Sequence, residues 1–154
     1  MNIDNSGKTA KQQVVNAITW FGTPPFYLLL CALLFPFNRK LCYLYLFAVI
    51  ATEIVCAVIK LITRTERPTP RKRETLYDQY DASTFPSAHT GRIASNMSIL
   101  FAAYSSSYIA AIGICMILSV GYSRVALKEH FLVDVIVGGI VGIIVSLLIF
   151  GWLY

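Results

Sequence analysis

The chain has 154 residues, of which 56% are hydrophobic and 14% are charged, and its formal net charge is +5. This composition excludes an ordinary soluble domain and indicates a single membrane domain, residues 1–154, whose core lies in the bilayer. The basic residues lie beside apolar segments, which favours anionic lipid headgroups, and not nucleic acid, as their partners. The cysteines show no CxxC spacing, so we expect neither a disulfide nor a metal site from Cys31, Cys42, Cys56 and Cys115.

The N-terminal part of the chain predicts a short helix and then a first membrane span. Residues 1–16 are mostly polar, and no cleavage pattern of a secretory signal follows the first apolar run, so we expect that run to be retained. The mixed polar and apolar residues 8–19 predict a short interfacial helix. Residues 20–37 predict the first span, because a spanning helix needs about 20 mostly apolar residues. A tight polar turn is expected at residues 38–40.

The second predicted span, residues 41–62, contains two charged residues, Glu53 and Lys60. They are seven residues apart and share one helix face, and charges within a span usually face protein or water. For Glu53 we expect a structural partner such as a buried hydroxyl. Residues 63–85 are rich in charges and proline, and they predict a loop or partly ordered segment outside the hydrocarbon.

A long uncharged stretch, residues 93–123, comes next. It is too long for one ordinary span, and it contains three serines, residues 105–107, near its middle. It therefore predicts a helical hairpin that turns at these serines. The two arms reach the needed length if they extend to about Ser87 at one end and Arg124 at the other.

The last predicted span, residues 131–154, carries Asp134 near its start. It also contains small residues that let helices approach closely, namely Gly138, Gly139 and Gly142. Together the segments predict an all-α fold: an integral membrane helical bundle of about five transmembrane helices with a short N-terminal interfacial helix.

Five spans place four helix ends on one membrane face: the end of the second, the start of the third, the end of the fourth and the start of the fifth. Unusual polar residues gather at these ends, and both histidines of the chain are among them. The set comprises Lys60, Arg67, Ser87, His89, Ser123, Arg124, His130 and Asp134.

His130 and Asp134 are four residues apart, so they would be neighbours on a helix. A carboxylate beside an imidazole fixes its tautomer and stabilises the charge that it acquires, which prepares His130 as a nucleophile or base. His89 could serve as the acid that protonates a leaving group. Taken alone, a histidine and an aspartate at this spacing are more often a hydrogen-bonded structural pair.

Three cations of the set, Lys60, Arg67 and Arg124, would offer donors that match phosphate oxygens. Ser87 and the backbone N–H groups of residues 86–89, at a predicted helix start, add an anion site. Phosphoryl transfer needs this combination, because charge must be neutralised around three equatorial oxygens. Lys60 or Arg124 alone could instead be an interfacial residue that reaches the headgroups. The collective geometry favours catalysis.

The other charged residues near the predicted site are expected to contact solvent or lipid. Lys128 and Glu129 are expected to be solvated or to face headgroups. Arg92, one helical turn after His89, could contact either the substrate phosphate or lipid. Four cations of the polar segment are expected to face headgroups: Arg64, Arg71, Lys72 and Arg73.

Three short motifs contain these candidate residues. They read KLITRTERP at residues 60–68, PSAH at residues 86–89 and SRVALKEHFLVD at residues 123–134. In order and spacing they resemble the motifs K-x6-RP, PSGH and SR-x5-H-x3-D of the phosphatidic acid phosphatase type 2 superfamily. The one departure is Ala88 in place of the usual glycine, which leaves the backbone N–H available. The motifs span about half of the chain.

The resemblance implies a role for each motif residue. His130 would attack phosphorus and form a phosphohistidine, Asp134 would orient His130, and His89 would protonate the leaving oxygen. The resemblance implies no metal and no other cofactor. Members of this family commonly have six spans, whereas five are expected here, and the missing span lies before the first motif. The substrate phosphate would be held by Lys60, Arg67, Ser87, the Ala88 N–H and Arg124.

The resemblance and the apolar spans together predict an integral-membrane lipid phosphatase. Its substrate would be a phosphate monoester or diphosphate of a lipid, such as undecaprenyl diphosphate or phosphatidylglycerol phosphate, and residues 68–85 would form much of the headgroup site. Two alternatives stay open: a catalytically silent protein that binds or transports lipid phosphates, and a transferase that passes the phosphoryl group to a lipid acceptor. The sequence predicts no particular oligomeric state.

The resemblance also bears on the side of the cell membrane on which the site lies. Many relatives place it outside the cytoplasm. Charge counting favours the opposite orientation, because most lysines and arginines lie on the motif side, against Arg39 and Lys40 on the other. Catalysis itself requires cations at the site, which inflates that count, so we expect the extracytoplasmic placement.

Overall fold

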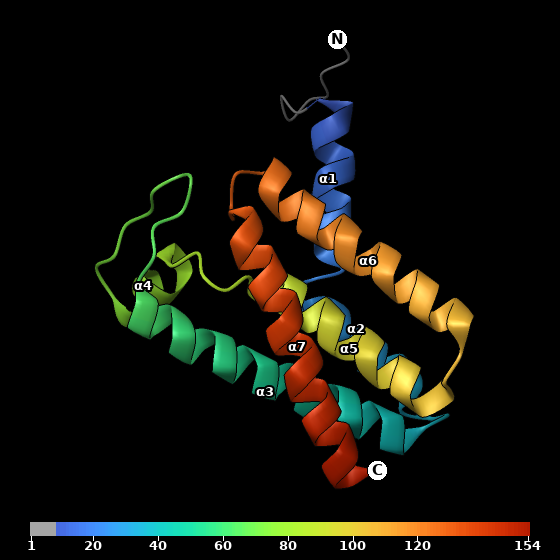
Figure 1. Cartoon of the computed structure of the whole chain (residues 1–154). Helices are drawn as coiled ribbons and strands as arrows, with labels where there is room; N and C mark the ends of the chain where they lie inside the picture. Colours follow the sequence, from blue (N-terminus) through green and yellow to red (C-terminus); the bar gives the residue numbers. More distant parts are fainter. Residues whose placement is uncertain (1–8) are drawn as a thin grey trace.

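The computed structural model describes residues 9–154, which form seven α-helices and no β-strand. Figure 1 shows α3, α5 and α7 crossing at the centre of the molecule, with α6 and α1 beside them. The predicted all-α class is confirmed. The helices are α1 (Ala10–Trp20), α2 (Pro24–Leu34), α3 (Arg39–Thr63), α4 (Leu76–Ala82), α5 (Ala88–Tyr104), α6 (Ser107–Ala126) and α7 (Leu132–Leu153).

Helix α5 packs against α3, α6 and α7, and its contact with α7 is the closest because glycines line it. A Cβ atom on Gly142 would lie 2.1 Å from the carbonyl oxygen of Gly91, and one on Gly138 would lie 2.3 Å from that of Ser87. No side chain larger than hydrogen fits at either position, so the two backbones are in contact. The close approach predicted for the last span occurs at these glycines.

The uncharged stretch folds as the predicted hairpin of α5 and α6. Helix α5 ends where Ser105 takes a left-handed conformation with a φ of 46°, and α6 begins at Ser107. A left-handed residue of this kind is a common way to end a helix. The outer ends of the hairpin, at Ala88 and Ala126, lie close to those expected.

Three helices, α3, α6 and α7, are long and apolar enough to cross a membrane. Helix α5 has 17 residues and pairs in the hairpin with α6. The described residues therefore provide three spans by length and hydropathy, or up to four if α1 and α2 are counted together as one bent span.

The first predicted span, residues 20–37, is not one continuous helix. Helix α1 ends at Trp20, α2 begins at Pro24, and the two are bent by 53° relative to each other. Pro24 and Pro25 explain the break, because proline cannot donate the hydrogen bond that would continue α1 and is favoured in the first turn of a new helix. The predicted interfacial helix corresponds to α1, which packs on α6, and Lys8 lies outside the described residues.

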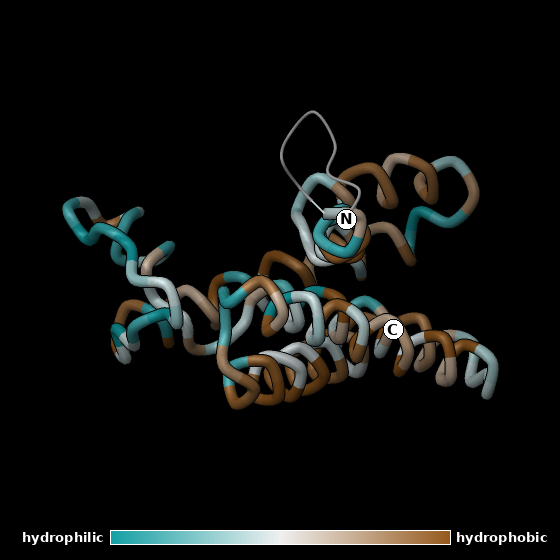
Figure 2. Tube along the Cα trace, turned by 90° about the horizontal axis from the view of Figure 1, so that it is seen from above, coloured by the Kyte–Doolittle hydropathy of each residue, from teal (hydrophilic) through white to brown (hydrophobic). Residues whose placement is uncertain are grey.

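The polar segment predicted as a loop, residues 63–85, contains the short helix α4. A capping box begins this helix: the Thr75 side chain accepts a hydrogen bond from the Asp78 N–H, and the Asp78 carboxylate accepts one from the Thr75 N–H. Figure 2 shows that the part of this segment that projects beyond the helices is hydrophilic, whereas the helices are mostly hydrophobic.

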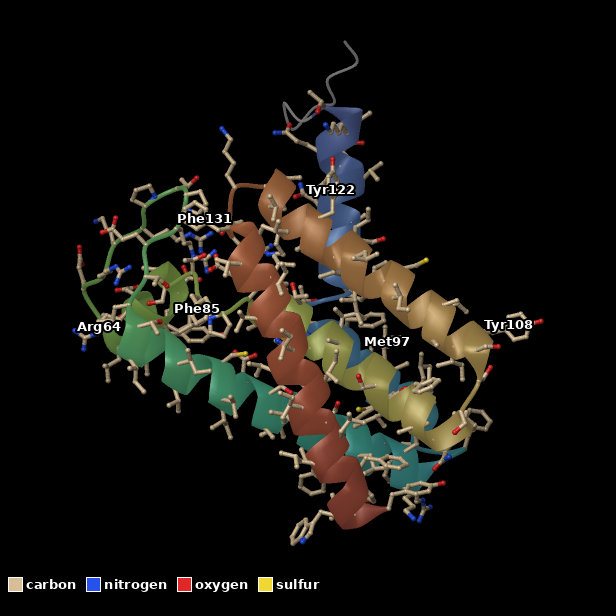
Figure 3. The ribbon with its side chains drawn as sticks, in the orientation of Figure 1. Arg64, Phe85, Met97, Tyr108, Tyr122 and Phe131 are labelled. Atoms are coloured by element: carbon tan, nitrogen blue, oxygen red, sulfur yellow. The ribbon has the colours of Figure 1, made fainter. Side chains whose placement is uncertain are left out.

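Four helix ends meet at one face, as predicted: the end of α3, the start of α5, the end of α6 and the start of α7. In Figure 3 nitrogen and oxygen atoms gather there, between the labelled residues Phe85 and Phe131. The chain ends on the opposite side, where Lys40 Nζ at the start of α3 donates to the Tyr154 carbonyl oxygen at 3.4 Å.

Candidate active site

His130 lies in the turn before α7, and its ring is joined to Asp134 through the hydroxyl of Thr84. His130 Nδ1 is 3.1 Å from Thr84 Oγ1 and 3.7 Å from Asp134 Oδ2. Thr84 Oγ1 donates to Asp134 Oδ2 at 2.5 Å, so the hydroxyl oxygen accepts the Nδ1 proton of His130. This geometry assigns the ring proton to Nδ1 and leaves the Nε2 lone pair available as a nucleophile.

Asp134 is held in place from several sides. Its Oδ2 also accepts the Phe131 N–H at 2.7 Å, and its backbone carbonyl accepts the Ser87 N–H at 2.9 Å. Asp134 and Thr84 are both almost fully buried, so water does not compete for these hydrogen bonds. The start of α5 and the start of α7 are thereby fixed relative to each other.

The surroundings of His130 favour a neutral ring. Burial lowers the pKa of His130 from its ordinary value to about 4, and the positive charges of Arg124, Lys60 and Arg67 act in the same direction. The Asp134 carboxylate opposes this shift in pKa. His130 is therefore unprotonated at neutral pH, as a nucleophile must be.

Two predicted phosphate ligands lie at the start of α5 and differ in availability. The Ser87 N–H is bonded to Asp134, and Ser87 Oγ accepts a hydrogen bond from Thr90 Oγ1 at 3.2 Å. Within residues 9–154, no acceptor from outside α5 binds the Ala88 N–H. An anion at this helix start would gain that donor and the favourable helix dipole.

His89 follows in the first turn of α5 and packs against the turn between α1 and α2. A Cβ atom on Gly22 would lie 2.9 Å from that of His89. The His89 ring lies within electrostatic range of Arg124, Arg92 and His130, so it belongs to the cluster predicted from the sequence.

Lys60, in the last turn of α3, is buried and binds the backbone that presents Thr84. Its Nζ donates to the Ser83 carbonyl oxygen and is 3.5 Å from that of Thr84. The same ammonium lies 5.4 Å from the centre of the Tyr80 ring. Lys60 therefore positions the Thr84 segment and adds positive charge near His130.

Arg67 and Arg124 share the carboxylate of Glu129. Arg67 Nη1 is hydrogen-bonded to Glu129 Oε2, and Arg124 Nη2 is 3.7 Å from the same oxygen. Arg71 Nη2 is 2.7 Å from both Glu129 oxygens. The prediction that Glu129 faces solvent or headgroups is wrong, because the turn before His130 folds back so that the Glu129 N–H donates to the Arg124 carbonyl. Arg71 is exposed, and its contact with headgroups stays a prediction.

Asp81, in α4, contacts two of these arginines, Arg67 and Arg71. Its backbone carbonyl accepts from Arg67 Nε at 2.7 Å, and its carboxylate pairs with Arg71 Nη1 at 2.6 Å. Arg124 Nε, in contrast, is buried and has no hydrogen-bond partner in the described part of the chain. Buried donors are normally satisfied, so Arg124 retains a donor for a ligand oxygen.

Arg92 pairs with Glu53 inside the bundle. Arg92 Nε is 2.8 Å from Glu53 Oε2, and Arg92 Nη1 donates to the Gly22 carbonyl oxygen. Glu53 also accepts a hydrogen bond from the Tyr80 hydroxyl, which is a partner of the kind expected for it. This network joins α3, α4 and α5 to the turn between α1 and α2.

Ser123, the first residue of the third motif, links two helices. Its Oγ donates to the Val120 carbonyl oxygen at 2.7 Å and accepts from Thr19 Oγ1 at 2.8 Å. Ser123 therefore fixes α6 against α1.

The sequence of the chain matches a known protein family. The sequence pattern of the PAP2 superfamily matches residues 41–154, which is more than half of the chain and includes all three motifs. The chain belongs to the PAP2 superfamily. No curated protein matches the chain.

Two solved structures share the fold. The crystal structure of Aquifex aeolicus LpxE superposes with a TM-score of 0.78 at 20% identity, covering 96% of this chain and 90% of that chain. The crystal structure of the first transmembrane PAP2 type phosphatidylglycerolphosphate phosphatase from Bacillus subtilis gives a TM-score of 0.76 at 24% identity, covering 94% of this chain and 77% of that chain. With its apolar helices, this PAP2 protein is an integral membrane protein.

The sequence did not identify three residues of the cluster, because none of them is a specified position of the three motifs. They are Thr84, Arg71 and Glu129. Thr84 lies two positions before the second motif and Glu129 lies next to His130, and this adjacency is the only sequence signal for either residue. Within residues 9–154, no group of three or more His, Cys, Asp or Glu residues is arranged to hold a metal ion.

Proposed function

We propose that this PAP2 protein is a metal-independent lipid phosphatase that works through a phosphohistidine on His130. The observation that carries the proposal is the chain of contacts from His130 through Thr84 to Asp134, which leaves Nε2 as the free nucleophilic atom. A protein that only binds lipid phosphates has no need of such an arrangement. Membership of the PAP2 superfamily supports the same activity.

In the first step the Nε2 lone pair of His130 attacks phosphorus, and the bond from phosphorus to the lipid oxygen breaks. His89, which carries a proton once the substrate phosphate offsets the charges of Arg124 and Arg92, gives that proton to the lipid oxygen. Asp134, acting through Thr84, stabilises the positive charge that the phosphorylated His130 ring acquires. In the second step His89 takes a proton from water, the water oxygen attacks phosphorus, and the phosphorus–nitrogen bond breaks to release inorganic phosphate and neutral His130.

The phosphoryl oxygens would bind donors that converge beside His130. Arg124 contributes its unpartnered Nε, and the start of α5 contributes the Ala88 N–H. Arg67 and Lys60 add positive charge close by, with Ser87 holding the backbone of the second motif. Fixed donors and cations around the equatorial oxygens are the main source of catalysis in phosphoryl transfer.

The lipid tail has an apolar path next to this site. A cavity of about 580 Å³ lies among α5, α6 and α7, and its lining includes Val125 and Leu132, which flank the turn that carries His130. Such a groove favours a lipid chain over a soluble phosphate. We propose undecaprenyl diphosphate or phosphatidylglycerol phosphate as substrate, and the phosphatidylglycerolphosphate phosphatase of Bacillus subtilis, which shares the fold, is consistent with the second.

The proposal is tested by phosphate release from a panel of lipid monophosphates and diphosphates in detergent with a metal chelator. We expect release by the parent protein and a loss of at least about a thousandfold in His130→Ala, because the covalent step needs this residue. Lys72→Ala is a matched control, since Lys72 is an exposed cation of the polar segment, and it should keep the parent activity.

Equal release by His130→Ala and the parent would contradict the mechanism. Mass analysis of the lipid products separates hydrolysis from transfer, since a transferase would phosphorylate a second lipid.

A further inference from the structure

The carboxylate of Glu129 sits among three arginines at the edge of the proposed phosphate site. Arg71 Nη2 lies 2.7 Å from each oxygen of the Glu129 carboxylate. Arg67 Nη1 donates a hydrogen bond to Glu129 Oε2, and Arg124 Nη2 lies 3.7 Å from the same oxygen. The backbone of Glu129 is also held, because its N–H donates to the Arg124 carbonyl at 3.0 Å. The acid is therefore a fixed part of the cluster.

Arg71 is held between two carboxylates. One side of its guanidinium is paired with Asp81 at 2.6 Å, and the other is paired with Glu129 at 2.7 Å. Burial lowers the pKa of Arg71, but hydrogen bonds to both carboxylates and their negative charges outweigh burial and raise it, so Arg71 stays charged. The Arg71 donors that bind Asp81 and Glu129 are not available to a phosphate while both acids hold them.

The charges around the site are therefore balanced for a small anion. The three arginines face two carboxylates, Asp81 and Glu129, which leaves one net positive charge, and Lys60 adds a second. The negative charge of Asp134 is offset by the protonated His89 of the proposed mechanism. A phosphate monoester carries a charge of about −1.5 to −2 at pH 7, which matches this balance. A diphosphate carries more negative charge, and its second phosphate would meet like charges at Asp81 and Glu129.

We propose that Glu129, together with Asp81, withdraws Arg71 from the substrate and makes the site selective for lipid phosphate monoesters over lipid diphosphates. This inference rests on the proposed phosphatase function and narrows its substrate class. Of the two lipids considered above, phosphatidylglycerol phosphate is the one that presents a phosphate monoester.

The test uses farnesyl phosphate and farnesyl diphosphate in the same detergent with chelator, because the two share one tail and differ only in the second phosphate. Initial rates are followed as loss of each starting lipid, and the result is the ratio of kcat/KM for diphosphate to that for monophosphate. A ratio measured on one preparation does not depend on the fraction of folded protein. We expect a ratio well below one for the parent.

Glu129→Gln keeps the shape of the side chain and removes its charge. We expect it to raise the ratio by about tenfold or more, because a close like charge at a partly exposed site has an effect of this size. Asp81→Asn should act in the same direction. Adding Arg71→Gln to Glu129→Gln should return the ratio toward the parent value, since the released cation is then lost. Glu74→Gln, an exposed acid of the same segment, should leave the ratio unchanged.

Several results would overturn the inference while leaving the phosphatase proposal intact. One is a parent protein that prefers the diphosphate, and another is a ratio that neither Glu129→Gln nor Asp81→Asn changes. A third is an equal rise of kcat/KM for both lipids in Glu129→Gln, which would mean that Glu129 competes with the reacting phosphate for the arginines. Turnover of neither lipid nor any other lipid phosphate by the parent would remove the proposed function, and this inference with it.

Discussion

A threonine hydroxyl, and not the carboxylate itself, contacts the ring of His130. Thr84 Oγ1 lies 3.1 Å from His130 Nδ1 and donates to Asp134 Oδ2 at 2.5 Å. The spacing of His130 and Asp134 predicts that the two residues are neighbours, and they lie 3.7 Å apart. The sequence could not place Thr84 between them, because Thr84 is brought there by the packing of the polar segment against the start of α7.

Replacing Thr84 tests this bridging role. In Thr84→Val the Nδ1 proton loses its acceptor and Asp134 loses a donor, so kcat should fall by about 10- to 100-fold, as expected for a lost hydrogen bond to a charged group. Thr84→Ser restores the hydroxyl and should keep kcat within a few-fold of the parent. Equal losses of kcat in the valine and serine variants would mean that the methyl packing of Thr84, and not its hydroxyl, matters.

The protonation of His130 can be measured directly, because the chain has only two histidines. Burial lowers the pKa of His130 to about 4, so its ring should stay neutral as the pH falls from 7 to 5 and protonate only below that range. NMR titration of protein labelled at the histidine ring carbons would follow this, with His89→Gln to assign the signals. A midpoint near the ordinary value of about 6.5 would contradict the buried, cation-surrounded site.

Among the helices, the close contact of α5 with α7 brings the second and third motifs together. Gly91 and Gly142 allow this contact, since a Cβ on Gly142 would lie 2.1 Å from the Gly91 carbonyl oxygen. The hairpin of α5 and α6 follows from the length of the uncharged stretch and its serines. The break between α1 and α2 could have been predicted from Pro24 and Pro25, but the length of the apolar run, residues 20–37, predicts one continuous span.

Gly142→Ala should therefore destabilise the protein. The added methyl group collides with backbone, which cannot move aside as a side chain can, so we expect a loss of about 1–3 kcal/mol. That loss corresponds to a Tm lower by about 2–12 °C for a chain of this size. Gly151→Ala is the matched control, because nothing lies within 4 Å of the added Cβ, and its Tm should equal or exceed that of the parent. A Tm unchanged in Gly142→Ala, measured in the same detergent, would be inconsistent with direct backbone contact.

In the molecule as a whole, the lengths of the uncharged stretches predict which helix ends share a face, and the structure agrees. Those lengths do not predict how the polar segment covers that face. Arg71, Asp81 and Glu129 come from two segments distant in the sequence, and their mutual contacts depend on how the polar segment lies against the turn between α6 and α7. The sequence predicts a headgroup site for residues 68–85 and solvent or headgroup contact for Glu129, but it does not predict that Arg71 pairs with both Asp81 and Glu129.

The orientation in the membrane is a property of the whole chain. We propose that the site faces away from the cytoplasm, which would put Tyr154, on the opposite side, in the cytoplasm. An alkaline phosphatase reporter fused after Tyr154 should then be inactive, because that enzyme needs the oxidising exterior. A reporter active at this position would reverse the assignment. The same fusion carrying His130→Ala controls for any effect of catalysis.

The most direct test of the account is to trap the phosphoryl group on His130. The protein is mixed with a lipid phosphate that it hydrolyses, denatured under alkaline conditions that preserve phosphohistidine, digested and analysed by mass. We predict one added phosphoryl group on the peptide that contains His130, absent from His130→Ala and absent without substrate. Turnover by the parent with no label on this peptide, or the same label in His130→Ala, would contradict the proposal that His130 is the nucleophile.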